Sequence, residues 1–591
     1  MFDKVLVANR GEIAIRVLRT LREIGVASVA VYSEIDRDAP FVELADEAYL
    51  LGPGPASESY LHIERILDAA ARSGAQAVHP GFGFLAENAP FARACAEAGV
   101  VFIGPPPSAI DAMGSKIRAR ELMSAAGVPI VPGVTDAVAD IDEARAIALE
   151  IGYPVAVKAA AGGGGKGFRV ALTADDLLDA FEGARRESEK FFADSVVYLE
   201  RYLPSPRHVE IQVLADGAGE CIWLGERDCS IQRRHQKLVE ETPSPVVSEG
   251  LRRRMGEASV RAALAVDYAS AGTCEYLVAG EEFFFLEMNT RIQVEHTVTE
   301  EVVGIDLVRE QVRIAAGEGM SIGQDDVRPR GHAFECRINA EDASRRFLPA
   351  PARITAYREP SGPGVRVDSG VRAGSDIPEI YDPMVAKLIV WDVDREAARR
   401  RMIRALDEYV IEGPTTLIPF HRWLFAQDEF IAGGALHETL DRMSEEPTPI
   451  PAPGSAAPRP TPDPAPDDAP LTERRFLAEV DGRRFDVALR YPGGGPASGD
   501  GVAARPRRRG GASSAAAVAA PTEALTTPMQ GTVLKVLVEQ GQSVVVGDVI
   551  CIVEAMKMEN EVAAHRAGTV TELNVAVGDG VQADQIVAVI D

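Results

Sequence analysis

The feature that most constrains the fold of this chain is an internal duplication near its C-terminus. Residues 531–541 (GTVLKVLVEQG) align with residues 568–578 (GTVTELNVAVG) at a constant separation of 37 residues, without a gap. Val544 and Val581 fall in the same register. Each copy alternates apolar and polar side chains between glycines, which is typical of short, half-buried strands joined by turns. The duplication therefore predicts a small all-β domain, built as a flattened barrel from two related halves.

One lysine lies where the chain passes from the first copy to the second. Lys557 stands between two methionines in the sequence EAMKME, residues 554–559. A tight hairpin at this point would hold the amine away from the core. A solvated surface side chain is the default interpretation of a single lysine. The position between the two copies and the flanking methionines favour an attachment point for a swinging cofactor.

The bulk composition limits the partners of this chain. Its 591 residues exceed one ordinary domain and predict several. It carries 62 Lys and Arg against 89 Asp and Glu, a formal net charge of −27, which opposes nonspecific binding to nucleic acid or to an anionic membrane. We therefore expect neither partner, and an anionic substrate would need a local cluster of cations.

The cysteines and the N-terminus bear on the compartment. Six cysteines are scattered without a CxxC pair, so the sequence predicts neither a disulfide framework nor a zinc site. The first residues run directly into an expected strand and helix, and no stretch approaches about 20 uninterrupted apolar residues. We expect no export signal, no membrane span and a cytoplasmic location.

The N-terminal three quarters of the chain alternate strands and helices. In residues 1–113, short apolar runs alternate with helical stretches such as residues 13–24, and this pattern predicts a parallel sheet covered on both faces. The expected strands are residues 5–8, 28–32, 77–79 and 100–104. A mixed α/β region follows over residues 114–330, and residues 331–446 contain a further expected strand at 384–391.

Residues 447–524 differ sharply in composition from the rest. The stretch 447–470 is rich in Pro, Ala and Asp, and 491–521 is rich in Gly, Ala and Arg, so both are predicted to be linker. Between them, residues 476–489 predict a β-hairpin turned at Asp-Gly, which is either a docking element or a remnant without a role. The basic run 505–509 is interpreted as solvated rather than as a binding patch.

Two segments of the large region predict a nucleotide site. Residues 153–158 form an apolar strand that ends in Lys158, and the glycine-rich run 162–167 follows. Such a run lets backbone N–H groups approach phosphate oxygens. It does not match the Walker A pattern, because Lys166 is followed by glycine. A flexible loop is the alternative for the glycine run alone, and the acidic segment described next favours nucleotide binding.

The second segment, residues 285–296 (FLEMNTRIQVEH), alternates polar and apolar side chains. As a continuous β-strand it would place its polar residues on one face, and Leu286, Met288, Ile292 and Val294 on the other. The polar residues are Glu287, Asn289, Arg291, Gln293 and Glu295. A solvated sheet face would give the same alternation, but the preceding phenylalanines and the variety of polar types favour a site. Carboxylate and amide oxygens suit Mg²⁺, arginine suits a planar anion such as bicarbonate, and the last glutamate suits a base.

These residues resemble the ATP-grasp fold of biotin carboxylases, and residues 554–559 resemble the biotinylation motif of biotin carboxyl carrier domains. Lipoyl domains have the same duplicated fold but usually lack the paired methionines, so we expect biotin. The likeness to biotin carboxylase covers residues 1–446. Further matching segments are HPGFGFLAEN (79–88), RHVEIQ (207–212), ERDCSIQRRHQK (226–237) and ECRINAED (335–342). One departure is Phe82, where many relatives have tyrosine.

The resemblance implies an α/β ATP-grasp fold with a parallel-sheet N-terminal domain (1–113), an ATP-grasp domain (114–330) and a C-terminal α+β domain (331–446). The linker (447–524) and an all-β, flattened-barrel biotinyl domain (525–591) would follow. Biotin would be attached to Lys557. ATP and the metal, Mg²⁺ or Mn²⁺, would be bound by the large region. For ATP the resemblance implies Lys116, Lys158, Gly163, Gly164, Gly165, Lys166, Glu200, Leu203 near the adenine, and His208, for which a structural histidine is the alternative. For the metal it implies Glu275, Glu287 and Asn289.

The resemblance also implies the reaction. Bicarbonate is a poor electrophile, so ATP would activate it as carboxyphosphate, and the charge that develops needs the metal and the lysines Lys116, Lys158 and Lys237. Breakdown to CO₂ would follow, and Glu295 or the released phosphate would take the ureido proton of biotin. Arg337 would hold the enolate. The catalytic residues implied are Arg291, Glu295, Lys237 and Arg337, and bicarbonate would be held by Lys237, Arg291, Gln293 and the backbone of Val294.

The sequence is therefore interpreted as the α subunit of an acyl-CoA carboxylase that acts on acetyl-CoA, propionyl-CoA or both. No segment between 447 and 524 is large enough to be a carboxyltransferase, so we expect a β subunit partner, together with a biotin protein ligase and homo-oligomers within a larger complex. The biotin carboxylase and carrier part of a pyruvate carboxylase is the second enzyme interpretation. A carrier and scaffold protein with an inactive ATP-grasp part is the alternative of another class.

Overall fold

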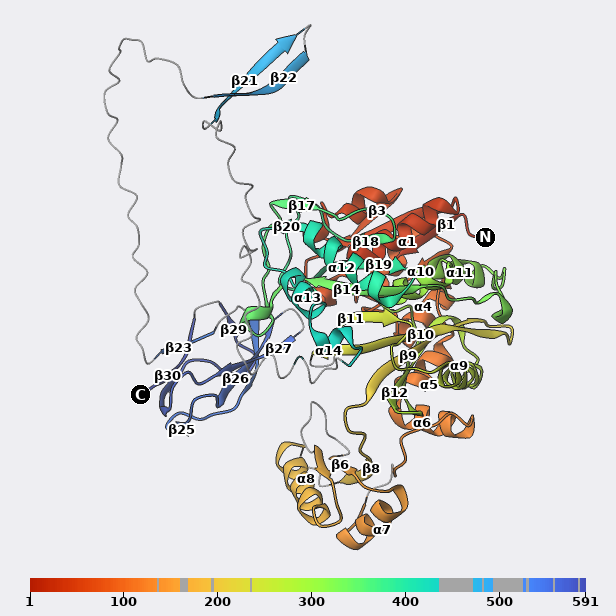
Figure 1. Cartoon of the computed structure of the whole chain (residues 1–591), viewed down its shortest axis with the longest axis vertical. Coiled ribbons are helices and arrows are strands. Elements are labelled where there is room, and N and C mark those ends of the chain that lie inside the picture. The colour runs from red at the N-terminus through yellow and green to blue at the C-terminus, as the bar shows by residue number, and fades with distance from the viewer. Residues whose placement is uncertain are drawn as a thin grey trace. The chain divides into compact units, whose positions relative to one another are not determined.

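The computed structural model divides the chain into two compact units, and each is described by itself. The larger unit contains Met1–Ile450 and Glu554–Asn560, and the smaller contains Pro451–Val553 and Glu561–Asp591. The residues that the structure describes are 1–134, 138–159, 168–192, 196–233, 236–434, 440, 471–480, 483–492, 524–527, 531–555, 558–582 and 585–591. Figure 1 labels the elements within each unit.

The chain begins with a five-stranded parallel sheet, as its alternating pattern predicts. The spatial order is β3 (Glu47–Gly52), β2 (Ala27–Ser33), β1 (Lys4–Val7), β4 (Ala77–His79), β5 (Val101–Phe102). Both faces are covered: Val5 and Val7 pack with α1 (Gly11–Glu23), whereas Leu6 packs with α3 (Ile63–Ser73) and α4 (Ala89–Glu97). The strand β3 was not among those expected, and its residues alternate in exposure, so that only Leu51 is buried.

An eight-stranded antiparallel sheet forms the centre of the larger unit. Its spatial order is β13 (Glu282–Asn289), β12 (Ala269–Ala279), β9 (Arg207–Asp216), β10 (Cys221–Arg233), β11 (Gln236–Thr242), β14 (His332–Asn339), β19 (Met384–Asp392), β18 (Val365–Ser369). The sheet is continuous across residue 330, because β11 pairs with β14. Apolar side chains of β9 and β12 pack against α9 (Glu249–Leu264) on one face. The helices α10 (His296–Val303), α11 (Leu307–Ala315), α12 (Arg395–Glu408), α13 (Ile418–Leu424) and α14 (Asp428–Ile431) complete this unit.

A smaller layer carries the predicted lysine strand. The strands β7 (Phe168–Ala171), β6 (Val155–Ala159) and β8 (Val197–Arg201) form a three-stranded sheet with β6 in the middle. The helices α7 (Ile141–Ile151) and α8 (Leu177–Phe192) pack on it through an apolar cluster. Lys158 lies on β6, as expected. Two helices, α5 (Pro107–Gly114) and α6 (Lys116–Ala125), precede this layer.

The hairpin predicted at residues 476–489 is present and longer than expected. The strands β21 (Leu471–Val480) and β22 (Arg483–Pro492) pair in antiparallel register from Leu471 opposite Pro492 to Val480 opposite Arg483. The Asp-Gly turn lies outside the described residues, and so do the linker stretches 447–470 and 493–523 and the basic run 505–509.

The carrier has the duplicated architecture that the sequence predicts. One sheet has the order β23 (Ala524–Thr526), β30 (Ile586–Ile590), β28 (Gly568–Leu573), β25 (Ser543–Val544). The other has the order β27 (Met558–Ala563), β26 (Val549–Ala555), β24 (Gly531–Val536), β29 (Gly580–Val581). Gly531 pairs with Val581, and Gly568 pairs with Val544, so each copy exchanges a strand with the other. Gly568 and Val581 lie 37 positions after Gly531 and Val544, so the two pairings are equivalent in the two copies of the repeat.

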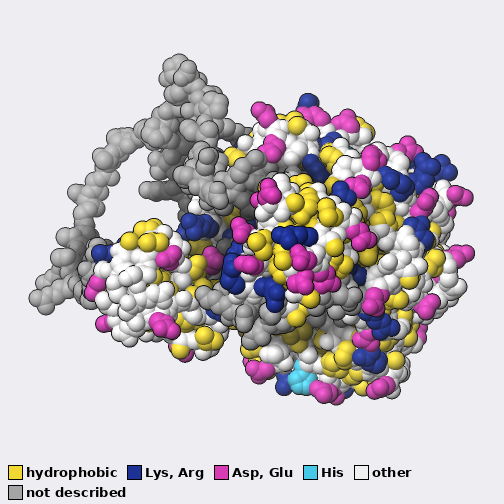
Figure 2. Space-filling view, turned by 90° about the horizontal axis from the view of Figure 1, so that it is seen from below, with side chains coloured by type: hydrophobic (Ala, Val, Ile, Leu, Met, Phe, Trp, Pro, Cys, Tyr) yellow, Lys and Arg dark blue, Asp and Glu magenta, His cyan; other side chains and the backbone are white. Residues whose placement is uncertain are grey.

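No helix within the described part of the chain is long and apolar enough to cross a membrane. All six cysteines are free. On the face of the molecule that Figure 2 shows, acidic and basic side chains are interspersed among the described residues. The net negative charge is therefore not gathered into one uniform field on that face.

Candidate active site

Side chains from nine strands of the larger unit, and from loops between them, line one cavity of about 1220 Å³. The cavity brings together every predicted site residue whose side chain is described. These are Lys158, Glu200, Leu203, His208, Lys237, Glu275, Glu287, Asn289, Arg291, Gln293, Val294, Glu295 and Arg337. They lie up to 179 positions apart in the chain, between Lys158 and Arg337, so only the fold places them together. Phe82 and Gly83 also line this cavity.

The other predicted residues lie outside the described part of the chain. This applies to Lys557, to Gly163, Gly164 and Gly165 and to Lys166; the backbone of Lys116 begins α6, but its side chain is not described. The described strands reach Lys557 from both sides, since β26 ends at Ala555 and β27 begins at Met558. A lysine amine at a crossing between two repeat halves is a suitable attachment group for biotin.

The continuous strand predicted over residues 285–295 is wrong in two respects. The strand β13 ends at Asn289, and the chain then turns to enter α10, with Glu295 at the N-cap position. Leu286 was expected on the core face, but it is 45% exposed and lines the cavity. The pairing with β12 shifts between Glu275 and Tyr276, which is a β-bulge that disturbs the alternation of faces.

Lys237 is the most heavily paired cation of the site. Its Nζ lies 2.5 Å from Glu210 Oε2, 2.7 Å from Glu295 Oε1 and 3.0 Å from Glu275 Oε1. Burial alone would lower the pKa of Lys237, but the carboxylates of Glu210 and Glu295 raise it well above its usual value. Lys237 is therefore a fixed positive charge, and a bound anion would meet it without a change of protonation.

Glu295 lies between two cations. Its second oxygen accepts a hydrogen bond from Arg337 Nη2 at 2.9 Å, and Arg337 Nε donates to Glu240 at 2.7 Å. Burial would raise the pKa of Glu295, but Lys237 and Arg337 hold it well below its usual value. Glu295 is therefore ionised at neutral pH. It becomes a stronger proton acceptor when a substrate takes over one of its cations, because the pKa then rises toward the pH of the medium.

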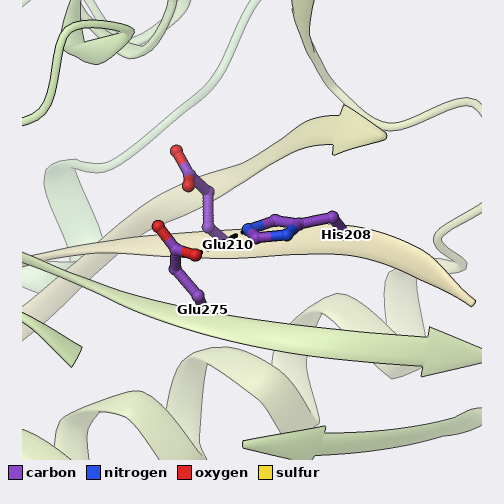
Figure 3. Close-up of side chains that lie close together, drawn as sticks. All are labelled: His208, Glu210 and Glu275. Carbon is purple, nitrogen blue, oxygen red and sulfur yellow. Dashed lines mark ion pairs between the residues drawn. The ribbon is translucent and has the colours of Figure 1, made fainter. Parts of the chain in front are cut away.

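Figure 3 shows His208 and Glu210 on β9 together with Glu275 on the neighbouring β12. The Nε2 atom of His208 lies 2.7 Å from Glu275 Oε2. Burial would raise the pKa of Glu275, but Lys237 and His208 hold it well below its usual value. The three side chains could be taken for a metal cluster. Both oxygens of Glu210, however, already accept from Arg227 and Lys237, so we interpret the group as an ion-pair network.

The predicted metal ligands fit a divalent cation. Glu275 on β12 pairs directly with Glu287 on β13, and Asn289 lies two residues farther along the same strand. Like charges directly opposite each other on paired strands repel, and a cation reduces that cost. Lys237 already lies 3.0 Å from Glu275, and Asn289 donates to Glu275 at 2.6 Å, so a bound metal would replace these contacts. Carboxylate and amide oxygens are the ligands that Mg²⁺ prefers. The donor set therefore suits a metal that also carries nucleotide phosphates.

The predicted ATP residues combine charge with an apolar wall. Lys158 on β6 forms an ion pair with Glu200 on the adjacent strand β8. Leu203 is 7% exposed and belongs to a small apolar cluster with Val131 and Phe284. A charged pair beside a buried leucine is an arrangement that can hold a phosphate at one end and a flat apolar ring at the other.

Sequence reasoning missed two fully buried cations that donate hydrogen bonds to residues of the site. Arg227 is fully buried and donates to Glu210 at 2.5 Å and to Gln293 Oε1 at 2.7 Å. Lys387 is also fully buried, and its Nζ donates to the carbonyl of Val294 at 2.7 Å. Two sequence signals could have found Glu210: it lies in the matching segment 207–212, and the alternation along β9 places it on the same face as His208, opposite the valine between them.

Comparison with known protein families gives four matches along the chain. Residues 1–110 match the biotin carboxylase N-terminal domain, and 115–322 match the ATP binding domain of the carbamoyl-phosphate synthase L chain. Residues 335–442 match the biotin carboxylase C-terminal domain, and 523–590 match a family described as biotin-requiring enzyme.

Three curated proteins illustrate the similarity. The biotin-dependent acyl-coenzyme A carboxylase alpha3 subunit of Mycobacterium leprae is 47% identical, over 99% of this chain and 98% of its own length. The propionyl-CoA carboxylase alpha chain of Ruegeria pomeroyi is 40% identical over 99% of both chains. A pyruvate carboxylase subunit of Methanothermobacter thermautotrophicus is 54% identical, over 73% of this chain and 88% of its own length.

Solved structures resemble three quarters of the chain. The biotin carboxylase domain of a thermophilic 2-oxoglutarate carboxylase, bound to ADP, matches with a TM-score of 0.72 and 48% identity. The match covers 75% of this chain and 99% of the chain in that structure. A structure of the same domain bound to bicarbonate gives a TM-score of 0.72 and 46% identity.

Proposed function

This chain belongs to the biotin-dependent carboxylases, with a biotin carboxylase and a biotin carrier fused in one α subunit, and we propose that it supplies carboxyl groups for acetyl-CoA, propionyl-CoA or both. The observation that carries the proposal is the gathering of the predicted side chains around one cavity, in the same chain as the duplicated carrier. The matched families indicate biotin and ATP, and a related biotin carboxylase domain that binds the magnesium salt of ADP supports Mg²⁺.

We assign the roles of the side chains from their charges and contacts. Lys158, Glu200, Leu203 and His208 would hold ATP, together with Lys116 and the glycine run. Glu275, Glu287 and Asn289 would hold the metal, which neutralises charge on the transferred phosphoryl group.

Bicarbonate would lie among Lys237, Arg291, Gln293 and the backbone of Val294. Glu295 would accept a proton, because it is ionised and lies beside this group. Arg337, which already holds Glu295, would stabilise the negative charge that develops next to it. Biotin on Lys557 supplies the nitrogen that receives the carboxyl group.

The acyl-CoA assignment is supported by the extent of the similarity. The two acyl-CoA carboxylase relatives align with 99% of this chain, including the linker and the carrier, whereas the pyruvate carboxylase relative aligns with 73%. The alignment with the alpha3 protein covers 593 positions, close to the length of this chain, whereas that with the propionyl-CoA enzyme covers 677. Pyruvate carboxylase is the second candidate, because such a relative is 54% identical over 73% of this chain.

A scaffold with an inactive ATP-grasp part is the alternative of another class. Such a chain would be free to lose the charged residues of the cavity, yet the ion pairs of Lys237, Glu295 and Arg337 are all present. We further propose a carboxyltransferase β subunit, a biotin protein ligase and further copies of this chain as partners. The six free thiols support a reducing, cytoplasmic location.

The assignment can be tested with the full chain and a co-purified β subunit. We expect ATP cleavage that depends on bicarbonate and biotin, and carboxylation of acetyl-CoA or propionyl-CoA when the partner is added. Pyruvate serves as the competing acceptor. Carboxylation of pyruvate alone would favour the second candidate, and ATP cleavage that ignores bicarbonate would contradict the assignment as an enzyme.

A further inference from the structure

The loop between β4 and α4 reaches from the N-terminal sheet to the end of β13. One oxygen of its Glu87 accepts from the backbone N–H of Thr290 at 2.9 Å and from the Thr290 hydroxyl at 3.4 Å. The other oxygen accepts from Nε of Arg291 at 2.9 Å. These partners lie more than 200 residues from Glu87 in the sequence, so the contact joins two distant segments of the chain.

This loop is held in place independently of Arg291. The side-chain amide of Asn9 donates to the carbonyls of Pro80 and Phe82, both at 2.7 Å. After Glu87, the side chain of Asn88 accepts from the backbone N–H of Phe91 at 2.8 Å and caps α4. A carboxylate carried by such a loop has a fixed position, and it can therefore fix the position of a flexible partner.

The contacts of Arg291 leave a defined part of its guanidinium available. Of its five N–H bonds, Nε donates to Glu87, Nη2 donates one to Asn289 Oδ1 at 3.0 Å, and Nη1 donates one to the Ile292 carbonyl at 3.3 Å. Among the described residues, no acceptor faces the other two N–H bonds, one on each terminal nitrogen. Arg291 lines the cavity with 21% of its side chain exposed, so a planar anion can accept from both.

We propose that Glu87 is a positioning residue for bicarbonate, which acts by holding the Arg291 guanidinium so that both terminal nitrogens face the cavity. This inference rests on the proposed function, since it takes bicarbonate as the anion that Arg291 meets. Glu87 occupies Nε and the adjacent backbone N–H, and it thereby prevents the side chain from turning its fork away from the cavity.

An electrostatic role and a positioning role of Glu87 predict opposite effects of its substitution on the use of bicarbonate. A carboxylate near a bound anion repels it, so a purely electrostatic role predicts that removing the charge improves the use of bicarbonate. A positioning role predicts the reverse, because the freed arginine loses its orientation. Glu87→Gln removes the charge at nearly constant shape. Glu87→Asp keeps the charge, but its shorter side chain cannot reach both Thr290 and Arg291.

The test measures ATP cleavage by the full-length chain with free biotin, at varied bicarbonate and at varied ATP. We expect both variants to raise the KM for bicarbonate about 10-fold or more, and the KM for ATP less than about 2-fold. The matched control is Glu97→Gln, an exposed carboxylate on α4 of the same unit, which should change neither constant. A lower KM for bicarbonate in Glu87→Gln, or normal behaviour of Glu87→Asp, would overturn the proposal. Equal changes in both constants, accompanied by a lower unfolding temperature, would overturn it too, since they indicate a structural role.

A double-variant cycle shows whether Glu87 acts through Arg291. Lysine at position 291 keeps the positive charge but has neither Nε–H nor a planar fork. We expect Glu87→Gln to add less than about 2-fold to the effect of Arg291→Lys, and additive effects would contradict the proposal. A measurement on the wild-type chain distinguishes failure of the proposed function from failure of the role of Glu87. If its ATP cleavage does not depend on bicarbonate, the proposed function fails; if it does but the variants behave like wild type, only the role of Glu87 fails.

Discussion

In the cavity of the larger unit, Lys237 contacts three carboxylates from three separate segments, whereas the core of the carrier consists of Val, Ile, Leu and Ala with one cysteine. The chemistry of the cavity is spread over many charged side chains that hold one another. In the proposed function, that of the carrier is concentrated in Lys557, which lies in the sequence between β26 and β27. We therefore expect one substitution to abolish the attachment of biotin to the carrier. Single substitutions in the cavity should instead each impair one step of the reaction, such as the use of bicarbonate or of Mg·ATP.

The largest effect is expected for Lys557→Ala. This variant removes the only amine between the repeat halves and should lose biotin completely, while ATP cleavage with free biotin continues. Intact mass and streptavidin blotting measure the attachment. The matched control is Lys535→Ala, an exposed lysine on β24 of the same domain, which should keep its biotin. A blot that stays positive for Lys557→Ala would place the attachment elsewhere.

The second largest effects are expected for two substitutions in the cavity that should impair different steps of the reaction. Arg291→Ala should spare ATP binding and abolish bicarbonate-dependent ATP cleavage, whereas Glu287→Gln removes a proposed charged metal ligand and should weaken the use of Mg·ATP. Each loss should be about 10²-fold or more, about 2.7 kcal/mol, because these groups act in the transition state. Glu282→Gln, on the same strand but in an exposed ion pair with Arg201, is the control. Near-normal turnover of both variants would mean that this segment is structural.

A smaller effect is expected from shortening the connection between the units. A flexible chain as long as residues 447–524 spans roughly 50 Å, which suits a carrier that moves between distant sites. Deletion of residues 447–470, with the β21–β22 hairpin intact, should spare ATP cleavage with free biotin. Acyl-CoA carboxylation by the complex with the β subunit should fall several-fold. Unchanged carboxylation after this deletion would show that reach does not depend on the linker.

The last effect concerns the stability of the larger unit and its dependence on pH, and it leaves the reaction itself aside. Burial raises the pKa of Glu12 to about 7, although the nearby Lys387 opposes this shift. Between pH 4.5 and 7 the folded state therefore keeps a proton that the unfolded chain has lost, and the free energy of unfolding falls as pH rises. Glu12→Gln removes this contribution, so the loss of stability between pH 5 and pH 8 should be smaller by about 2 to 3 kcal/mol.

Tryptophan fluorescence can follow this change in one unit alone. The three tryptophans, Trp223, Trp391 and Trp423, all lie in the larger unit, so thermal unfolding monitored by their emission does not report on the carrier. The unfolding temperature of Glu12→Gln should decrease less than that of wild type between pH 5 and pH 8. An equal decrease in both proteins would contradict the assigned contribution of Glu12.

The carrier shows how far a repeat determines a fold. Two gapless copies predicted two related halves, and the reciprocal pairing of Gly531 with Val581 and of Gly568 with Val544 confirms it. The alternation of short apolar runs with helical stretches also predicted the parallel sheet of the N-terminal region, apart from its edge strand β3. Both are properties of short segments, which the sequence displays directly.

The cavity shows where such reasoning stops. The polar residues 287–295 were predicted to lie together, and the cavity does contain them, but the expected continuous strand is wrong. A bulge beside Leu286 and the turn after Asn289 change which side chains face the cavity. Arg227 and Glu87 were missed because their partners are distant in sequence, and a charged residue on an alternating strand or in a loop is usually solvated.

The central claim is that this chain transfers a carboxyl group from bicarbonate to its own carrier, and isotopically labelled bicarbonate tests it most directly. The purified, biotinylated full chain is mixed with ATP, Mg²⁺ and labelled bicarbonate, without the β subunit, and acid-labile label on the protein is counted. We predict label that requires ATP and is absent from Lys557→Ala and from Arg291→Ala. Label that appears without ATP, or that persists in Lys557→Ala, would contradict the account.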